Sequence, residues 1–367
     1  MMLLETDSEI APCLTGDLIA ESAQEAILAA RNLGDTRWAS LARAWSVAFL
    51  FDRLEAIFAS GEEPAIAFNR ALADLSEFFN AARKSGFASL GRDGGNDFDP
   101  PNDLGSVEGV TGDHYGRLFK EFSSTSYWDE PARLLSLRLT RNDIDASSLE
   151  DKEVLDAGCG GGRYTVAWRL LGAKRAVGID VSSIGVQDAR RRVAEAGISG
   201  VEFEEGSVLE LPFKNDSFDI VFSNGVLHHT VDWKAGIREL VRVMRPGGMG
   251  WLYLIENPGG LFWDSIEILR VIMKDEKRDV ARGALQVLGI PANRIFYMLD
   301  HVLVPINIRL TPQEIENCLI EAGATGIRRL VRGADFDRIE RIYQKDPYSD
   351  VKYGVGENRY VFSKDQV

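Results

Sequence analysis

The chain has 367 residues, of which 45% are hydrophobic and 27% charged, and its formal net charge is −14. This length exceeds that of one typical domain, so we expect a core fold with an added domain. An acidic surface repels phosphate backbones, which argues against a nucleic-acid partner. No apolar run approaches the ~20 residues that span a bilayer. The first residues lack the basic segment of a signal peptide, and only three cysteines occur, so we expect a cytoplasmic protein without a membrane span.

Residues 1–85 are predicted to form an N-terminal helical domain, because apolar residues recur at helical spacing over residues 17–34, 36–60 and 63–84. The middle segment carries an aromatic stripe, which is typical of a core. Any part of that stripe that the helices leave uncovered could dock on the rest of the chain or on a second subunit, so a homodimer stays open. Residues 86–112 are rich in glycine, proline and aspartate and are predicted to be a flexible linker.

Residues 153–163 carry the clearest sequence signal for a ligand-binding turn. A short apolar run ends in Asp156, and a helical pattern begins near Tyr164. Between them, glycines stand at alternate positions: Gly158, Gly160 and Gly162. This pattern predicts a strand, a tight turn and a helix N-terminus, whose first N–H groups lack internal partners and can face a ligand. The spacing differs from the dinucleotide fingerprint G-x-G-x-x-G, whose third glycine would fall at Arg163.

Further strands are predicted downstream, each separated from the next by a helical segment. They cover residues 176–179, 201–203, 218–222 and 250–255, with a last pair near 325–331 and 359–362. Such alternation predicts right-handed βαβ units and a parallel sheet. The first of these strands ends in Asp180, at about the spacing from the turn where an acid meets ribose hydroxyls. Thr311 and Glu314 predict a helix that starts with a capping box.

Six motifs follow one another over residues 150–257: D-x-G-C-G-x-G, D-x-S, L-P-F, F-D-x-V, L-H-H and L-x-R-V-x-R-P-G-G. Together they resemble the class I S-adenosylmethionine-dependent methyltransferases, nearest to the type 11, ubiquinone/menaquinone methyltransferase-like small-molecule branch. The resemblance implies a Rossmann-like, doubly wound α/β sheet of seven strands in the order 3-2-1-4-5-7-6, with the last strand antiparallel. It implies S-adenosyl-L-methionine as the cofactor.

On this resemblance the methyltransferase domain would cover residues 113–367. It would consist of an N-terminal cover (113–150), a core (151–257), a lid insertion (258–310), and a C-terminal helix with edge strands (311–367). The insertion is interpreted as a lid because it would hang over the carboxyl edge of the sheet, where open α/β folds bind ligands.

The resemblance also implies the residues that hold the cofactor. They are Asp156, Gly158, Cys159, Gly160, Asp180, Val181, Ser207, Val208 and Asn224. Asp180 has the two acceptor oxygens that a ribose diol requires, while Asp156 would order the methionine end and Asn224 would lie beside it. Ser207 stands where the family commonly has an acid for the adenine amino group. Adenine recognition would therefore rest on its hydroxyl and on the backbone around Val208.

His228 and His229 follow the fourth strand, where the cofactor pocket would open toward the acceptor. An imidazole there could act as a general base near neutral pH, although a structural role for the pair stays open. The cover segment offers Tyr115 as a further catalytic candidate, with Tyr127 and Trp128 beside it. No cluster of side chains has metal-ligand spacing, so we predict no metal.

These features predict an enzyme that transfers a methyl group, by in-line displacement, to O, N or C of a small-molecule or biosynthetic-intermediate acceptor. One alternative is a macromolecular acceptor, a peptide or a lipid-linked saccharide, docked through the N-terminal helices. Another is a non-catalytic scaffold that binds the cofactor. A nicotinamide-dependent oxidoreductase is disfavoured by the glycine spacing and by the lack of a Y-x-x-x-K pair after the fourth strand.

Overall fold

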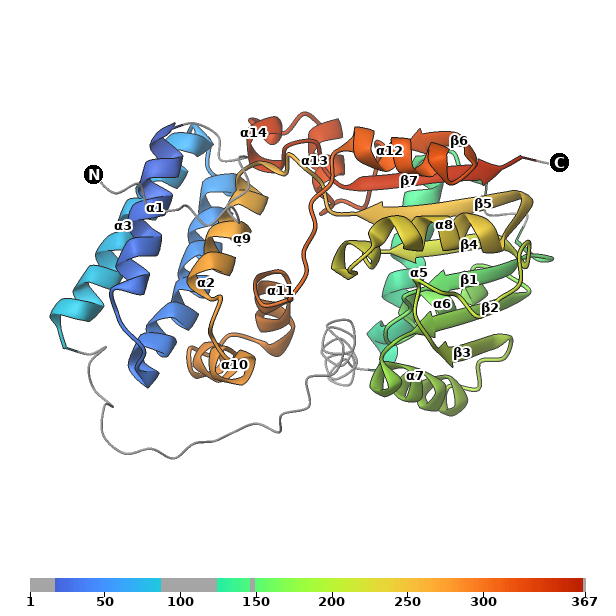
Figure 1. The fold of residues 1–367 in the computed structure, drawn as a ribbon, viewed down its shortest axis with the longest axis horizontal. Coiled ribbons are helices and arrows are strands. Elements are labelled where there is room, and N and C mark those ends of the chain that lie inside the picture. The colour runs from blue at the N-terminus through green and yellow to red at the C-terminus, as the bar shows by residue number, and fades with distance from the viewer. Residues whose placement is uncertain (1–16, 87–123, 146–148, 366–367) are drawn as a thin grey trace. The chain divides into compact units, whose positions relative to one another are not determined.

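The computed structural model describes residues 17–86, 124–145 and 149–365. The chain divides into two compact units, and each is assembled from separate stretches of sequence (Figure 1). The first comprises Met1–Asn102, Pro258–Val304 and Lys345–Val355. The second comprises Asp103–Asn257, Pro305–Gln344 and Gly356–Val367.

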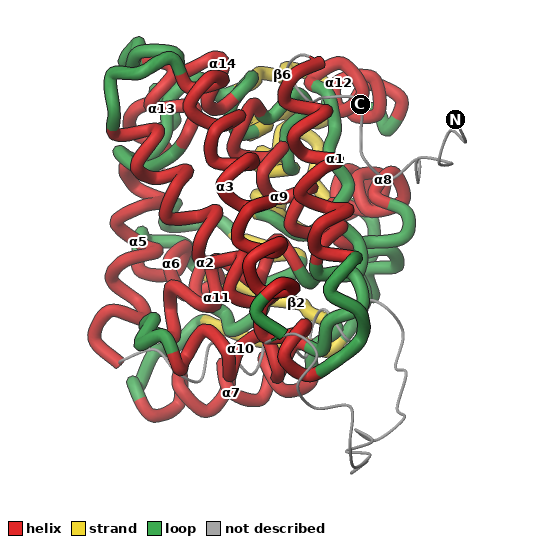
Figure 2. Tube along the Cα trace, turned by 90° about the vertical axis from the view of Figure 1, so that its left-hand side faces the viewer, coloured by secondary structure: helices red, strands yellow, loops and turns green. Residues whose placement is uncertain are grey.

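The first unit is helical throughout its described residues. Its helices are α1 (Asp17–Arg31), α2 (Arg37–Ala59), α3 (Pro64–Lys84), α9 (Gly260–Ile272), α10 (Arg278–Val287), α11 (Ala292–Val302) and α14 (Ser349–Tyr353). The first three lie where the sequence predicts helices. Helix α1 runs beside α3 and α9, as Figure 2 shows, and α2 contacts α3 and α10. Thr36 starts α2 because its hydroxyl oxygen accepts a hydrogen bond from the Ala39 N–H at 3.1 Å.

Residues 258–304 belong to this helical unit, whereas the sequence suggested a lid insertion within the methyltransferase domain. Two contacts explain the grouping. The Arg43 guanidinium of α2 pairs with the Glu276 carboxylate at 2.7 Å, and both side chains are nearly buried. The Trp45 indole N–H donates to the Ala284 carbonyl oxygen at 3.1 Å. Residues 258–304 therefore pack against α2 and form part of the same helical unit. The lid role and the expected domain bounds stay predictions.

The second unit contains a seven-stranded sheet. Its strands are β1 (Glu153–Ala157), β2 (Arg175–Asp180), β3 (Val201–Glu205), β4 (Phe218–Asn224), β5 (Met244–Leu254), β6 (Ala324–Arg329) and β7 (Asn358–Lys364). Their order is β3-β2-β1-β4-β5-β7-β6, and β7 pairs antiparallel with both neighbours. This confirms the predicted order and the antiparallel last strand. The carboxyl ends of the parallel strands β1 to β5 therefore meet at one edge of the sheet.

Helices cover both faces of the sheet (Figure 1). Among the described residues of this unit, the helices are α5 (Ser124–Arg141), α6 (Arg163–Leu170), α7 (Ser183–Glu195), α8 (Trp233–Val243), α12 (Pro312–Glu321) and α13 (Arg338–Tyr343), and a 3₁₀ turn, η2 (Leu227–His229), follows β4. Successive side chains of a strand point to opposite faces of the sheet, so each face has its own hydrophobic core. Leu155 of β1 packs in a cluster with Leu240 of α8, whereas its neighbour Val154 packs in another with Trp168 of α6. The capping box predicted for Thr311 at the start of α12 is present.

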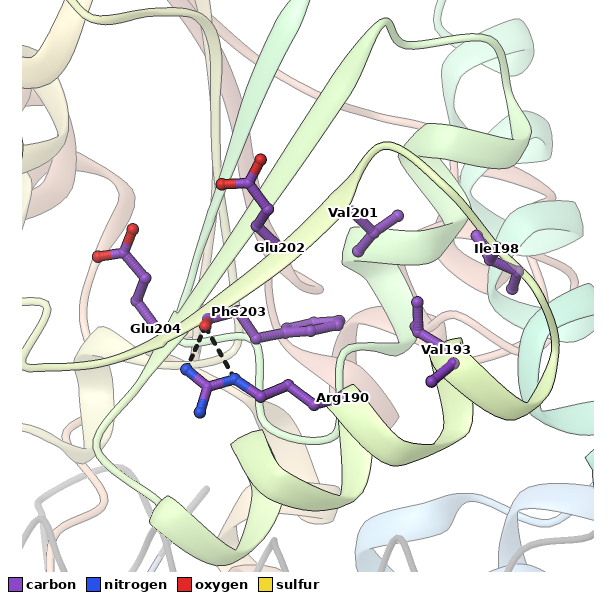
Figure 3. A pocket seen from close by; sticks show the side chains of 8 residues that line it. Arg190, Val193, Ile198, Val201, Glu202, Phe203 and Glu204 are labelled. Atoms are coloured by element: carbon purple, nitrogen blue, oxygen red, sulfur yellow. Dashed lines mark hydrogen bonds between the residues drawn. The ribbon is translucent and has the colours of Figure 1, made fainter.

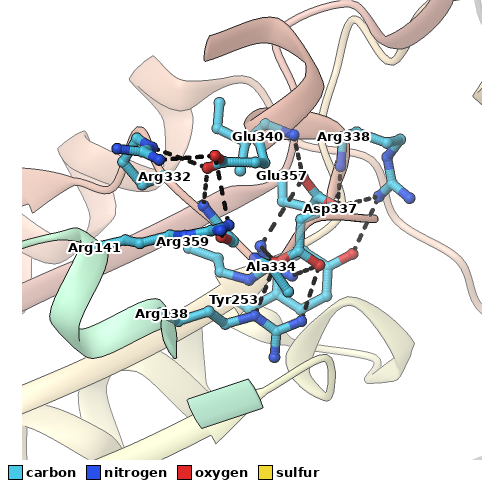
Figure 4. A network of polar contacts seen from close by, with 12 residues as sticks. Arg138, Arg141, Tyr253, Arg332, Ala334, Asp337, Arg338, Glu340, Glu357 and Arg359 are labelled. Carbon is cyan, nitrogen blue, oxygen red and sulfur yellow. Dashed lines mark hydrogen bonds and ion pairs between the residues drawn. The ribbon is translucent and has the colours of Figure 1, made fainter. Parts of the chain in front are cut away.

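A buried network of ion pairs fastens α5, α13 and β7 to the end of β5 (Figure 4). The Asp337 carboxylate accepts two hydrogen bonds from the Arg138 guanidinium, at 2.8 and 2.9 Å, and pairs with Arg359 at 2.9 Å. Burial alone would raise the pKa of Asp337, but the charges of Arg359 and Arg138 hold it well below its usual range. Beyond it, Arg338 pairs with the buried Glu256 carboxylate at 2.7 Å.

Replacing Asp337 should be strongly destabilising, because Asp337→Ala leaves two buried guanidinium groups without their shared carboxylate. We expect the free energy of unfolding, measured by urea denaturation, to fall by about 3–5 kcal/mol. The matched control is Asp335→Ala, since Asp335 pairs with Arg141 at 2.6 Å but its side chain is 75% exposed. This variant should lose less than about 1 kcal/mol. Equal losses in the two variants would contradict the role of the network.

Candidate active site

The glycine turn between β1 and α6 has the backbone that its sequence predicts. Gly158, Gly160 and Gly162 have φ angles of 85°, 53° and 76°, which residues with a Cβ rarely adopt. A Cβ at Gly158 would overlap the Val226 side chain, and one at Gly162 would overlap the Phe203 ring. The turn therefore packs between Val226, in the loop that follows β4, and Phe203 of β3. Only glycine fits at the two contact positions, Gly158 and Gly162.

Several N–H groups of this turn donate to acceptors within the protein, whereas we expected them to face the ligand. The Gly158 and Cys159 N–H groups donate to the Ile179 carbonyl oxygen at 2.8 and 3.0 Å. The Gly162 N–H donates to the Cys159 carbonyl oxygen at 2.8 Å. These bonds fix the path of the turn beside the end of β2. The turn therefore gives this edge of the sheet a backbone of fixed shape.

Asp180, the last residue of β2, holds the turn through both of its carboxylate oxygens. Oδ2 accepts from the Gly160 N–H at 2.8 Å and Oδ1 accepts from the Ser182 N–H at 2.9 Å. A carboxylate has about four lone-pair sites, so each oxygen can accept one more hydrogen bond. Burial raises the pKa of this carboxyl, and the two N–H bonds counteract that effect. Asp180 can therefore order the turn and still accept from two vicinal hydroxyls.

Asp156 and Cys159 lie deeper than Asp180. The Asp156 carboxylate is buried and accepts from the Thr165 hydroxyl at 2.6 Å, which ties the end of β1 to the first turn of α6. Burial raises the pKa of Asp156 to about 7. Burial also raises the pKa of the Cys159 thiol, which keeps that group protonated and unreactive. These contacts give both side chains a role in the shape of the turn.

The remaining cofactor candidates line the same carboxyl edge. The Val181 side chain is 37% exposed after β2, and Val208 after β3 is buried in the core. The Ser207 hydroxyl oxygen accepts from the Leu209 N–H at 3.1 Å. The Asn224 amide oxygen accepts from the Trp251 indole N–H at 3.3 Å. The structure thus brings these residues to one edge, where Ser207, Val208 and Asn224 also have contacts within the protein.

Tyr127 of α5 is buried against the glycine turn. Its hydroxyl donates to the Gly161 carbonyl oxygen at 2.8 Å, and the Arg192 guanidinium lies 4.3 Å from its ring centroid. Burial raises the pKa of this phenol, so it fits a structural contact better than proton transfer. The Trp128 ring meets it edge-on at 4.5 Å. Tyr115, the third aromatic candidate, lies outside the described residues.

The paired histidines occupy η2, directly after β4, and the two rings differ in their hydrogen bonds. Both are buried, with ring centroids 4.2 Å apart. Nδ1 of His228 accepts from the Ile255 N–H at 3.3 Å, so a neutral His228 carries its proton on Nε2. Nδ1 of His229 lies 2.7 Å from the Ile306 carbonyl oxygen, to which it must donate. A neutral His229 therefore has its lone pair on Nε2.

One surface hollow lies elsewhere in this unit (Figure 3). Its lining comes from α7, β3 and the loop between them, and the Arg190 guanidinium there donates to the Phe203 carbonyl oxygen at 2.5 Å. None of the predicted site residues lines it. Within the described residues, no helix is long and apolar enough to cross a membrane, and no group of three acids, histidines or cysteines is placed to hold a metal.

Comparison with known proteins is consistent with this geometry. Residues 155–252 match a family model described as a methyltransferase domain. The chain is 30% identical to the 27-O-demethylrifamycin SV methyltransferase of Amycolatopsis mediterranei, over 52% of this chain and 70% of that protein. It is 28% identical to an O-methyltransferase of Penicillium expansum, over 40% of this chain and 56% of that one.

The chain belongs to the class I S-adenosylmethionine-dependent methyltransferases. Among solved structures, the geranyl diphosphate C-methyltransferase of Streptomyces coelicolor, in complex with Mg²⁺, geranyl diphosphate and S-adenosyl-L-homocysteine, is 16% identical, with a TM-score of 0.40. That match covers 64% of this chain and 80% of that one.

The cofactor of this methyltransferase is S-adenosylmethionine, and its residues fit that group. The positive φ angles of Gly158, Gly160 and Gly162 give a turn without Cβ atoms at these positions, at the carboxyl edge of the sheet. Asp180 offers acceptor capacity for the ribose diol, and a second buried carboxyl, Asp156, lies at the end of the adjacent strand.

Sequence reasoning missed the segment that supports the histidines. The Ile306 carbonyl oxygen faces Nδ1 of His229, and the Ile308 N–H donates to the His228 carbonyl oxygen at 2.9 Å. The alternating residues Ile306-Asn307-Ile308-Arg309-Leu310 were a signal for an extended stretch. These residues fall within the predicted lid, residues 258–310.

Asp180→Ala should lower the affinity of the protein for S-adenosylhomocysteine by about 10- to 100-fold, since unpaired hydroxyls cost about 1–3 kcal/mol. Isothermal titration calorimetry measures this directly. The matched control is Asp219→Ala. Asp219 lies near the amino end of β4, where it accepts from Arg245 at 2.7 Å and from the Glu153 N–H at 2.9 Å. That variant should bind S-adenosylhomocysteine like the wild type. A folded Asp180→Ala protein with unchanged affinity would refute the ribose assignment.

Proposed function

We propose that this methyltransferase methylates a hydroxyl oxygen of a small-molecule, natural-product-like acceptor, with His229 as the general base. The observation that carries the proposal is the hydrogen bond between Nδ1 of His229 and the Ile306 carbonyl oxygen at 2.7 Å. It fixes the tautomer that leaves Nε2 as the basic nitrogen. A carbonyl behind Nδ1 also stabilises the imidazolium that forms when Nε2 takes a proton.

When bound, S-adenosylmethionine would supply an electrophilic methyl carbon and a neutral thioether leaving group. The protein has to align the acceptor with that carbon and to remove the acceptor's proton. His229 takes the hydroxyl proton on Nε2, which leaves an oxygen lone pair for the attack. His228 has a different task. Its Nδ1 accepts from the Ile255 N–H, so the ring orders the loop after β4 against the end of β5 and acts as a positioning residue.

A hydroxyl acceptor is favoured over a carbon or nitrogen acceptor by the presence of this base and by the relatives. Two of them are named for methyl transfer to oxygen. A neutral hydroxyl is a weak nucleophile and gains much from deprotonation by a base, whereas a neutral amine is already nucleophilic. A macromolecular acceptor and a cofactor-binding scaffold are the alternatives, and a methyl-transfer assay separates them from the proposal.

The assay uses S-adenosylmethionine labelled with tritium in its methyl group. We offer 27-O-demethylrifamycin SV, the acceptor named for a relative, and an organic extract of cells that lack this protein. We expect label in the organic phase. His229→Ala should lower kcat by about 10²- to 10⁴-fold with unchanged affinity for S-adenosylhomocysteine.

The matched control is His228→Ala, which should lower the melting temperature but keep kcat within about 10-fold at saturating substrate. A His229→Ala variant with near wild-type kcat would exclude His229 as the base. Label that enters only protein or lipid-linked material would favour the macromolecular alternative, and no label anywhere would favour the scaffold.

A further inference from the structure

A short extended segment, Ile306–Leu310, lies along the loop after β4 and the end of β5. The Ile308 N–H donates to the His228 carbonyl oxygen, and the Leu310 N–H donates to the Ile255 carbonyl oxygen, both at 2.9 Å. A bridge between Glu256 and Leu310 continues the same pairing. The segment therefore borders the paired histidines at the edge of the sheet where ligands bind in this fold.

The side chains of this segment divide between two faces. Leu310 belongs to the hydrophobic core that contains Leu155 and Leu240, and Ile308 packs against that core. Because successive side chains of an extended chain point to opposite sides, Asn307 and Arg309 lie on the face away from the core. Asn307 is thus the polar residue between the two backbone groups, Ile306 C=O and Ile308 N–H, that hold His229 and His228.

The Asn307 amide is shielded from solvent, yet it makes no hydrogen bond. Neither its Nδ2 nor its Oδ1 has a partner, although both atoms are buried. Native proteins rarely leave a buried amide unsatisfied, because the group loses its bonds to water without replacement. Asn142 shows the ordinary case, since its Nδ2 donates to the Arg138 and Arg332 carbonyl oxygens at 2.8 and 2.9 Å. Its Oδ1 accepts from the Val331 and Arg332 N–H groups.

We propose that Asn307 recognises the acceptor, by a hydrogen bond between its side-chain amide and a hydroxyl or carbonyl oxygen of that molecule next to His229. The inference rests on the proposed function. An amide both donates and accepts, so it matches a polyoxygenated acceptor and disfavours one that is purely hydrocarbon at this point. Asn307 determines specificity and is distinct from the base.

Exchange of Asn307 for leucine tests this because a binding role and a structural role predict opposite shifts in stability. Asn307→Leu removes an unsatisfied buried amide, so the melting temperature of the ligand-free protein should rise by about 1–4 °C. The KM for the acceptor in the tritium assay should rise at least about 10-fold, while the affinity for S-adenosylhomocysteine stays the same. Asn307→Ala removes the same amide without added bulk and should show the same rise in KM.

The matched control is Asn142→Leu, the same exchange at a satisfied amide, which should lower the melting temperature. A lower melting temperature for both Asn307 variants, or a KM that neither variant changes, would overturn the inference. Loss of S-adenosylhomocysteine binding would also overturn it, since Asn307 would then serve the cofactor. A wild-type protein that methylates no hydroxyl acceptor contradicts the proposed function, and the inference with it, whereas wild-type transfer that the variants leave unchanged contradicts the inference alone.

Discussion

The carboxylate of Asp180 joins the end of β2 to the glycine turn, and the geometry of the site depends on that junction. Its two oxygens accept from the Gly160 and Ser182 N–H groups, so the turn after β1 and the start of α7 are fixed by one side chain. The glycines allow this approach because their φ angles are positive. The same acid that would bind the ribose therefore also shapes the turn against which the cofactor would lie.

From this junction, the site extends along the carboxyl edge through backbone contacts. Val226 packs over Gly158 and begins the loop that carries both histidines. His228 is held by the Ile255 N–H of the segment after β5, and His229 by the Ile306 carbonyl oxygen. The buried network around Asp337 ties the end of β5 to β7 and α5. The glycine turn and the histidine loop are thus supported by separate parts of the second unit.

The sequence predicted what local patterns encode. The strands, the capping box at Thr311 and the three N-terminal helices follow from short-range spacing, whereas the strand order was implied by the family resemblance. The grouping of residues 258–304 with the N-terminal helices could not be predicted, because Arg43 and Glu276 meet across a separation of 233 residues. Likewise, the paired histidines were visible in the sequence, but their different tautomers depend on distant backbone groups. Asn307 went unnoticed because an unsatisfied amide is a property of the folded structure alone.

Hydrogen–deuterium exchange of the full chain, with and without S-adenosylhomocysteine, tests the central claim most directly. The claim is that the cofactor lies against the glycine turn and Asp180, so the amides of residues 158–163 and 180–182 should exchange more slowly in its presence. The loop over residues 225–229 should be protected with them. Unchanged exchange in these segments, with protection confined to other parts of the chain, would contradict the account.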